Sequence, residues 1–386
     1  MEKKAIFFIS VLKKIADVYF NTFFVFYFFK IANYEVLPVA KYYIILYFFT
    51  GLGFFLIRSA MKKNRKVPYF RIGISLQALY ITLILLLKEN IVDHIILVGL
   101  MNGMADGFYY YPKNILDSEK ISNEGRQKYS GIVNTINKVS GIIIPVVLGV
   151  ALTFLSYVQV GKIFFCIYVI MFILSFGIKE DYKPVNKFKL KEYLKLIRQS
   201  DDIKRATIVS FMSGLTYSSG VMGLIITLLK INCFKTNLNL GFVDSACAGL
   251  SLIICVLFAL KIKKRHFKKI LWVSGFLSLA VLCLLGIAPS EGFLVFYLFV
   301  RYSCIEIINL ISQNKVINLS NVKELKNELK VEYYLIRDLI YAFSRCTGYL
   351  LLILVCVFFG MDYISYLLII PGISLLLETL LVSKIS

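Results

Sequence analysis

Two basic residues stand alone in long apolar stretches of this chain: Lys138 in NKVSGIIIPVV and Arg345 in SRCTGYLLLIL. Each begins the same pattern, which is a basic residue, any residue, a hydroxyl residue and glycine. A charge in the middle of a segment that crosses a bilayer costs several kcal/mol, so it normally faces a protein interior or a water-filled cavity. Because this feature recurs in both halves of the chain, we expect a duplicated membrane bundle with a polar centre.

Acidic residues at matching positions offer partners for both cations. Asp106 and Glu306 lie 200 positions apart, each on a polar face with helical spacing. These faces consist of Asn102, Asp106, Tyr109 and Lys113 in one segment and of Tyr302, Glu306, Asn309 and Gln313 in the other. Counted from the segment ends, Asp106 lies at a depth similar to Lys138, and Glu306 at a depth similar to Arg345. We therefore expect two symmetry-related ion pairs, Asp106 with Lys138 and Glu306 with Arg345.

Two roles remain open for these pairs. In the first, the carboxylate takes up and releases a proton, which breaks the pair and shifts the equilibrium between inward and outward conformations. In the second, the pairs only hold neighbouring helices together, because structural ion pairs show the same features as functional ones.

Further polar residues fall within the apolar stretches. Asp17 shares a helix face with Asn21, and it either faces the polar centre or lies solvated at the inner membrane surface. Arg301 lies toward the centre of its segment, which makes it a candidate for contacting a substrate anion. Other candidates for lining a cavity are Asn134 beside Lys138, and Ser210, Ser213 and Tyr217 in one polar strip. The hydroxyl groups of that strip can equally bond back to their own helix.

The composition requires a membrane to cover so much apolar surface. Hydrophobic residues make up 59% of the 386 residues and the mean hydropathy is +0.76, whereas soluble domains have about 45–50% apolar residues. We therefore expect an all-α polytopic membrane protein with twelve apolar segments, each of about 20 residues and long enough to span the bilayer. The segments are 8 to 31, 41 to 57, 68 to 87, 91 to 112, 129 to 154, 162 to 178, 206 to 230, 242 to 262, 270 to 288, 293 to 314, 335 to 359 and 363 to 383.

The net charge of +21 is distributed unequally between alternate loops. Basic residues cluster in every second loop, for example at 58 to 66 and 179 to 205, whereas the other loops carry scattered single cations. This positive-inside asymmetry predicts a multi-pass protein of the cytoplasmic (inner) membrane with both termini in the cytoplasm, and it accounts for the charge without a nucleic-acid partner. The first segment follows Lys3 and Lys4 without a small-residue cleavage site, so we expect an uncleaved signal anchor.

The residue types needed for catalysis or metal binding are scarce. Seven of the eight cysteines fall in apolar segments, no CxxC pair occurs, and His94 and His266 are the only histidines. We therefore expect no metal site and no cofactor. No clustered catalytic motif and no phosphate-binding GxxxxGK[ST] loop is present either, so we expect neither an enzyme nor ATP-driven transport by this chain alone.

The two halves of the chain resemble each other. Three short matches follow one another in order, at separations of 191, 202 and 207 positions. A long basic stretch divides the halves, and in it Leu190, Tyr193, Leu194 and Ile197 have the spacing of an amphipathic helix. We expect an N-terminal six-helix bundle at 1–180, a cytoplasmic linker with this helix at 181–204, and a C-terminal six-helix bundle at 205–386.

Two local motifs point to a known family. Gly53, Arg58 and Lys62 match a loop motif of glycine, aspartate-arginine, glycine and basic residues, although Ile57 replaces its aspartate and Ala60 its second glycine. The fifth segment carries Gly141, Pro145 and Gly149, which is similar to a glycine-proline motif of exporters and also suits close helix packing. With its helix count and repeat, the whole chain resembles a divergent bacterial member of the major facilitator superfamily (MFS).

This resemblance implies a monomeric transporter whose two bundles rock about a central cavity. We expect secondary active transport of a small amphipathic or anionic solute, as proton-coupled export. The expected partners are that solute, membrane lipids and protons. A lipid or glycolipid flippase of the same fold and a solute uptake permease remain as alternatives.

Overall fold

The computed structural model describes most of the chain. Described are residues 2–63, 65–120, 123–179, 188–216, 220–234, 242–243, 245–250, 252–253, 267–320, 325 and 329–385. Within these ranges the side chains at 3, 21, 22, 118–120, 123–135, 137, 138 and 234 are not described.

The described residues form helices and no strand. The first half contains α1 (Glu2–Val18), η1 (Tyr19–Phe24), α2 (Val25–Ile31), α3 (Val36–Lys62), α4 (Lys66–Leu87), η2 (Lys88–Ile91), α5 (Ile95–Lys120), α6 (Asn123–Phe154) and α7 (Tyr157–Ser175). The second half contains α8 (Leu190–Gln199), α9 (Asp201–Thr216), α10 (Val221–Phe234), α12 (Phe267–Ile287), α13 (Glu291–Val300), η4 (Arg301–Ile305), α14 (Glu306–Leu319), α16 (Lys330–Phe358), η5 (Met361–Leu368) and α17 (Ile369–Val382).

The long helices have the length and composition of membrane spans. Among the described residues, eight helical stretches are long and apolar enough to cross a bilayer, and a shorter apolar stretch covers Val139–Phe154. The expected segment 242 to 262 lies mostly outside the described residues. Each of the other expected segments coincides with one described helix or with a run of consecutive helices. The all-helical membrane fold expected from the sequence is therefore confirmed.

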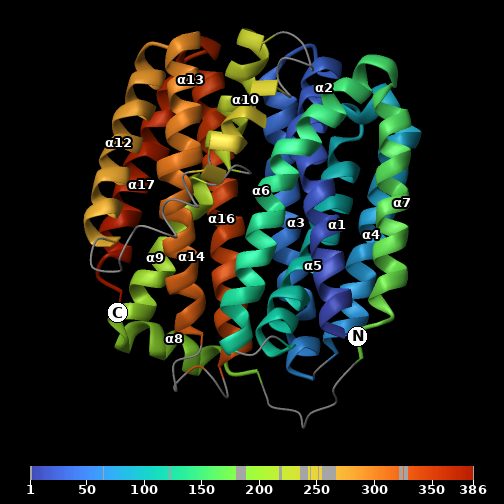
Figure 1. Cartoon of the computed structure of the whole chain (residues 1–386), viewed down its shortest axis with the longest axis vertical. Helices are drawn as coiled ribbons and strands as arrows, with labels where there is room; N and C mark the ends of the chain where they lie inside the picture. Colours follow the sequence, from blue (N-terminus) through green and yellow to red (C-terminus); the bar gives the residue numbers. More distant parts are fainter. Residues whose placement is uncertain are drawn as a thin grey trace.

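Figure 1 shows how the two parts of the chain lie relative to each other. Helices α1 to α7, in blue to green, lie at the right, and α9 to α17, in yellow-green to red, lie at the left. Both chain ends and the short helix α8 lie at the lower end of the view. Helices α3 and α16 pack together and join the two sides: the Tyr43 and Tyr349 rings stack with centroids 4.9 Å apart, and a Cβ atom at Gly51 would lie 3.6 Å from Ala342 Cβ.

Glycines let α3 and α5 approach each other closely. A Cβ atom added to Gly103 would lie 2.3 Å from the carbonyl oxygen of Leu46, and one added to Gly53 would lie 3.1 Å from the Cα of Gly107. Such contact is possible only where side chains are missing. It fixes the rotation of α5 and thereby the direction in which Asp106 points.

Two spans contain a short π-helical stretch, η1 between α1 and α2 and η4 between α13 and α14. A π turn changes the period of a helix locally, and such turns occur frequently at functional sites. Because η4 covers Arg301–Ile305, a constant helical period does not hold between Tyr302 and Gln313.

Candidate functional site

A cavity of about 410 Å³ lies between the two sides of the molecule. Its lining combines aromatic, amide and charged side chains from α1, η1, α3, α4, α5 and α7 on one side and from α14 and α16 on the other. The charged and amide residues in the lining are Lys13, Lys14, Asp17, Gln77, Asn102, Asp106, Asn114, Gln313, Arg337, Asp338 and Arg345. The aromatic residues are Phe20, Phe24, Tyr42, Tyr43, Tyr47, Phe54, Tyr80, Tyr110, Tyr168 and Tyr341.

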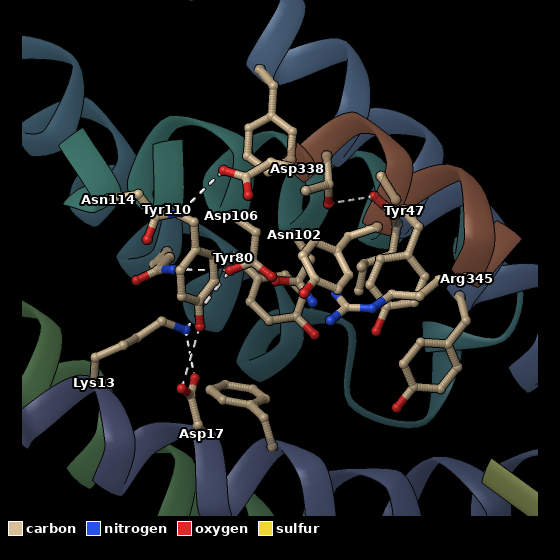
Figure 2. A pocket seen from close by; sticks show the side chains of 18 of the residues that line it. Lys13, Asp17, Tyr47, Tyr80, Asn102, Asp106, Tyr110, Asn114, Asp338 and Arg345 are labelled. Carbon is tan, nitrogen blue, oxygen red and sulfur yellow. Dashed lines mark hydrogen bonds and ion pairs between the residues drawn. The ribbon is translucent and has the colours of Figure 1, made fainter. Parts of the chain in front are cut away.

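One cation joins two carboxylates in the wall of this cavity. Lys13 Nζ lies 2.7 Å from Asp17 Oδ1 and 3.8 Å from Asp106 Oδ1. Lys13 is only 6% exposed, and its ammonium group also lies 5.3 Å from the centroid of the Tyr110 ring. Figure 2 shows Lys13 and Asp17 from α1 facing Asp106 and Tyr110 from α5. A buried cation is tolerated here because two anions and an aromatic face surround it.

Two groups of hydrogen bonds lie along the wall at and near Asp106. Gln77 Nε2 donates to Asp106 Oδ1 at 3.1 Å. One turn away on α5, Asn102 Nδ2 donates to the Tyr42 hydroxyl at 2.6 Å, and that hydroxyl lies 2.8 Å from the Tyr80 hydroxyl. The bonds of Tyr42, Tyr80 and Asn102 connect α3, α4 and α5, and the bond from Gln77 on α4 orients Asp106.

The second side of the cavity carries the residues of α16. Arg337 Nη2 lies 2.6 Å from Asp338 Oδ1, and Asn114 Nδ2 on α5 donates to Asp338 Oδ2 at 3.0 Å. This bond crosses from one side of the molecule to the other. Two turns further along α16, the Arg345 guanidinium lies 4.9 Å from the centroid of the Tyr47 ring on α3.

The structure brings some of the predicted site residues together and separates others. Asp17, Asn102, Asp106 and Arg345 all line the cavity. Predicted residues that are described but are not among those lining it are Arg301, Tyr302 and Glu306. The side chains of Asn21, Asn134 and Lys138, and the whole of Tyr217, lie outside the described residues. The pairs of Asp106 with Lys138 and of Glu306 with Arg345 therefore remain predictions, and the described ion-pair partner of Asp106 is Lys13.

The loop motif at the end of α3 makes a contact that the sequence did not indicate. Lys62 Nζ lies 3.0 Å from Glu332 Oε2 at the start of α16, and Glu332 Oε1 accepts a hydrogen bond from the backbone N–H of Lys189 at 2.7 Å. This carboxylate thus links α3, the residue before α8, and α16. Arg58 lies over its own neighbour Phe55, with 3.6 Å between the guanidinium carbon and the ring centroid.

The glycine-proline motif lies on α6, next to the second half of the chain. Pro145 is inside the helix and buried, and Gly149 is also buried. A Cβ atom at Gly141 would lie 3.9 Å from Ala248, and Ser245 Oγ donates to the carbonyl oxygen of Ile142 at 2.6 Å. These contacts agree with the packing interpretation of the motif.

Sequence reasoning missed Lys13, Gln77 and Glu332. The spacing of four residues between Lys13 and Asp17 predicts a contact on one helix face, and this signal could have identified Lys13. The sequence holds no comparable signal for Gln77 and Glu332, because their partners lie on other helices.

Comparisons with known proteins agree with this architecture. The family model of the Major Facilitator Superfamily matches residues 9–320. An uncharacterised protein of Bacillus subtilis (strain 168), YqgE, is 22% identical over 250 residues, which are 64% of this chain and 57% of YqgE.

Three solved structures share the fold over nearly their whole length. The first is the human organic anion transporter MFSD10, with a TM-score of 0.65 and 13% identity over 98% of each chain. The second is a bacterial homologue of the iron transporter ferroportin, with a TM-score of 0.65 and 14% identity over 99% of this chain and 97% of that chain. The third is the Escherichia coli fucose:proton symporter FucP, with a TM-score of 0.63 and 14% identity over 99% of this chain and 96% of that chain. The chain belongs to the major facilitator superfamily, whose members are membrane transporters.

Proposed function

We propose that this transporter carries a small organic anion with an aromatic or other flat apolar part through the cavity between its two sides. The movement is alternating access, in which the cavity faces each side of the membrane in turn. The observation that carries the proposal is the lining itself, because charged residues from both halves of the chain meet over a wall of aromatic rings.

The size of the cavity supports a small solute. Ligand pockets for small molecules measure about 300–1,000 Å³, and this cavity of about 410 Å³ falls at the lower end of that range. Such a volume suits one or two rings with their substituents. The acyl chains of a glycolipid would have to remain outside.

The chemistry of the lining supports an anion. The described lining contains four cations, Lys13, Lys14, Arg337 and Arg345, against three carboxylates, Asp17, Asp106 and Asp338. Lys13 and Arg337 contact these carboxylates directly. Arg345 lies over Tyr47, so its guanidinium and this ring can hold a carboxylate or sulfonate together with an attached ring. This assignment gives Arg345 the role that the sequence suggested for Arg301.

We further propose that transport is export in exchange for protons. Asp106 and Asp17 both pair with Lys13. Protonation of Asp106 would remove one of these two pairs, so that the Lys13 ammonium group could interact with Asp17 and with an anion in the cavity. A proton and an anion can thereby influence each other through one cation. The glycine-proline motif of α6 supports the outward direction, which it suggests by resemblance to exporters.

The experiment is a flux measurement in proteoliposomes with ions whose charge does not depend on pH. Benzenesulfonate is the anionic probe, phenyltrimethylammonium is the cation of similar size, and hexanesulfonate is the anion without a ring. We expect saturable flux of benzenesulfonate, slower flux of hexanesulfonate, and no flux of the cation above that of protein-free vesicles.

Matched variants assign the effect to the cavity. Arg345→Gln should reduce benzenesulfonate flux by about tenfold or more, because a hydrogen bond between charged groups contributes roughly 1.5–3 kcal/mol. Arg198→Gln on the exposed face of α8 is the control and should leave the flux unchanged. The proposal is overturned if neither sulfonate moves faster than in protein-free vesicles, or if the cation is the probe that moves.

A further inference from the structure

Glu378 on α17 is a buried carboxyl group that lies away from the cavity. Its exposed fraction is 0%, and it is not among the residues that line the cavity. Ser213 Oγ on α9 donates to Glu378 Oε1 at 2.8 Å. The other carboxyl oxygen, Oε2, is buried and has no hydrogen-bond partner among the described atoms.

Each helix packed against this position contributes neutral groups. Helix α9 provides Ser213, α14 provides the Ser312 hydroxyl, and α16 provides Tyr341. Helix α12 packs Gly275 against Thr379, the neighbour of Glu378. The cation of α14, Lys315, is bound elsewhere, since it donates to the carbonyl oxygens of Val382 and Ile385.

The two arginines of α16, Arg337 and Arg345, line the cavity, whereas Glu378 is not among its lining residues. Among the described residues, Glu378 accepts a hydrogen bond from the Ser213 hydroxyl group, and no cation lies within ion-pair distance of its carboxyl group. A carboxylate ion that is buried in a membrane bundle without a cation costs several kcal/mol, whereas a carboxylic acid there carries no charge.

We propose that Glu378, with Ser213 and Ser312, is a proton-binding site in the second half of the chain, separate from the carboxylates of the cavity. The buried surroundings without an ion-pair partner favour its protonated state. Loss of the proton creates an uncompensated charge between α9, α14 and α17, which these helices can relieve only by admitting water or by moving apart. The site therefore makes the packing of this half depend on pH.

A short series of contacts connects the site with the cavity. Ser213 is followed by Gly214, where a Cβ atom would lie 2.7 Å from the Cβ of Ser344 on α16. Ser344 donates in return to the carbonyl oxygen of Phe211 on α9, and its chain neighbour is Arg345. Tyr341 on α16 lines the cavity and also interacts with Glu378. A shift of α9 on deprotonation would thus reach the residues that we expect to hold the solute.

The test is infrared difference spectroscopy of the purified protein in lipid, recorded without solute between acidic and alkaline pH. A protonated carboxyl group buried from water gives a C=O stretching band, which should disappear as the pH rises. Glu378→Gln keeps the shape and the hydrogen-bonding capacity of the side chain without a titrating group, and should remove this band. Asp362→Asn replaces an exposed carboxylate and should leave the band in place.

Three outcomes overturn the proposal. The first is the absence of a pH-dependent carboxyl band in the wild-type protein, and the second is an unchanged band in Glu378→Gln. The third is a signal that follows the sodium concentration at constant pH, which would assign the site to a metal cation. If Glu378→Gln does not fold, the difference spectrum of Ser213→Ala decides: a shifted carboxyl band supports the site, and an unshifted band contradicts it.

A transport measurement links this site to the proposed function, on which this second test rests. In proteoliposomes, Glu378→Gln should lower the accumulation of benzenesulfonate driven by a pH gradient by about tenfold, while the exchange of labelled for unlabelled benzenesulfonate continues. Unchanged accumulation would contradict a coupling role for the site. The infrared result does not depend on any solute, so failure of the proposed substrate and failure of the proton site can be told apart.

Discussion

At the scale of single residues, Lys13 is the central group of the cavity wall. It is held between Asp17 on its own helix and Asp106 on α5, so one ammonium group balances carboxylates from two helices. Because Lys13 is buried, removal of its charge leaves Asp106 without its described ion-pair partner and Asp17 with Lys14, whose Nζ lies 3.9 Å from Asp17 Oδ2.

The first prediction concerns this balance. Lys13→Gln should lower the free energy of unfolding by about 1–3 kcal/mol, since both carboxylates keep part of their solvent exposure. The double variant Lys13→Gln with Asp106→Asn should regain most of the loss, because it removes the carboxylate left without a described ion-pair partner, whereas Asp17 keeps Lys14. Thermal unfolding in detergent measures both. A double variant that is less stable than the single one would contradict the arrangement.

The second prediction concerns Asp106 and protons. Asp106→Asn keeps the bond with Gln77 possible but abolishes titration at this position. Benzenesulfonate transport should then depend less on pH, and exchange should persist. Asp362→Asn on the surface is the matched control. An unchanged pH profile in Asp106→Asn would remove this carboxyl group from the coupling mechanism.

The sequence identified part of this site because the cost of charge in a membrane leaves a visible pattern. Asp106, Asn102 and Arg345 were found as polar residues in apolar segments, and they line the cavity. The contacts between helices could not be predicted in the same way, since Gln77 reaches Asp106 only through the packing of α4 against α5. The spacing of residues along one helix does not determine how that helix is rotated relative to its neighbours.

At the scale of helices, close approach of α3 and α5 positions the cavity wall. The third prediction is that Gly103→Ala costs about 3 kcal/mol of stability, because the added methyl group would collide with the backbone of Leu46. Gly292→Ala is the control, since no atom lies within 4 Å of a Cβ atom at that position. Thermal unfolding should separate the two variants, and equal stability would show that α3 and α5 are not packed at this distance.

The positions of the helices were predictable from apolar length, whereas their ends and the interruptions within them were not: α3 covers Val36–Lys62 where 41 to 57 was expected, and α5 ends at Lys120 where 112 was expected. The segment 293 to 314 corresponds to α13, η4 and α14, and its π-helical part lies at Arg301–Ile305. A regular α-helical period across this segment predicts that Tyr302, Glu306 and Gln313 lie on one helix face. Of these three residues, only Gln313 lines the cavity. A π turn depends on the packing around it, so it gives no regular pattern in the sequence.

At the scale of the whole molecule, the fold followed from composition and repetition, because the bilayer allows few ways to satisfy the backbone. The contacts between the two sides had to come from the structure. Lys62 and Glu332 are 270 positions apart, and their ion pair closes one end of the interface between α3 and α16. This pair must open if the two sides rock apart at that end.

The fourth prediction concerns this contact. Glu332→Gln removes the charge from an ion pair that joins the two sides, so the conformation open at this end should become more populated. A cysteine introduced at Thr50 in the cavity wall, in a cysteine-free background, should then react faster with a thiol reagent added from that end. Equal rates with and without Glu332→Gln would show that the pair does not control access.

Alternating access through the central cavity is tested most directly by joining the two sides. Cysteines replace Lys62 and Glu332 in a cysteine-free background, and a cleavable bismaleimide connects them; the pair Lys113 and Asp117 within α5 serves as the control. Benzenesulfonate flux in proteoliposomes should stop when 62 and 332 are joined, return after cleavage, and remain unaffected in the control. Full flux through fully cross-linked protein would contradict the account.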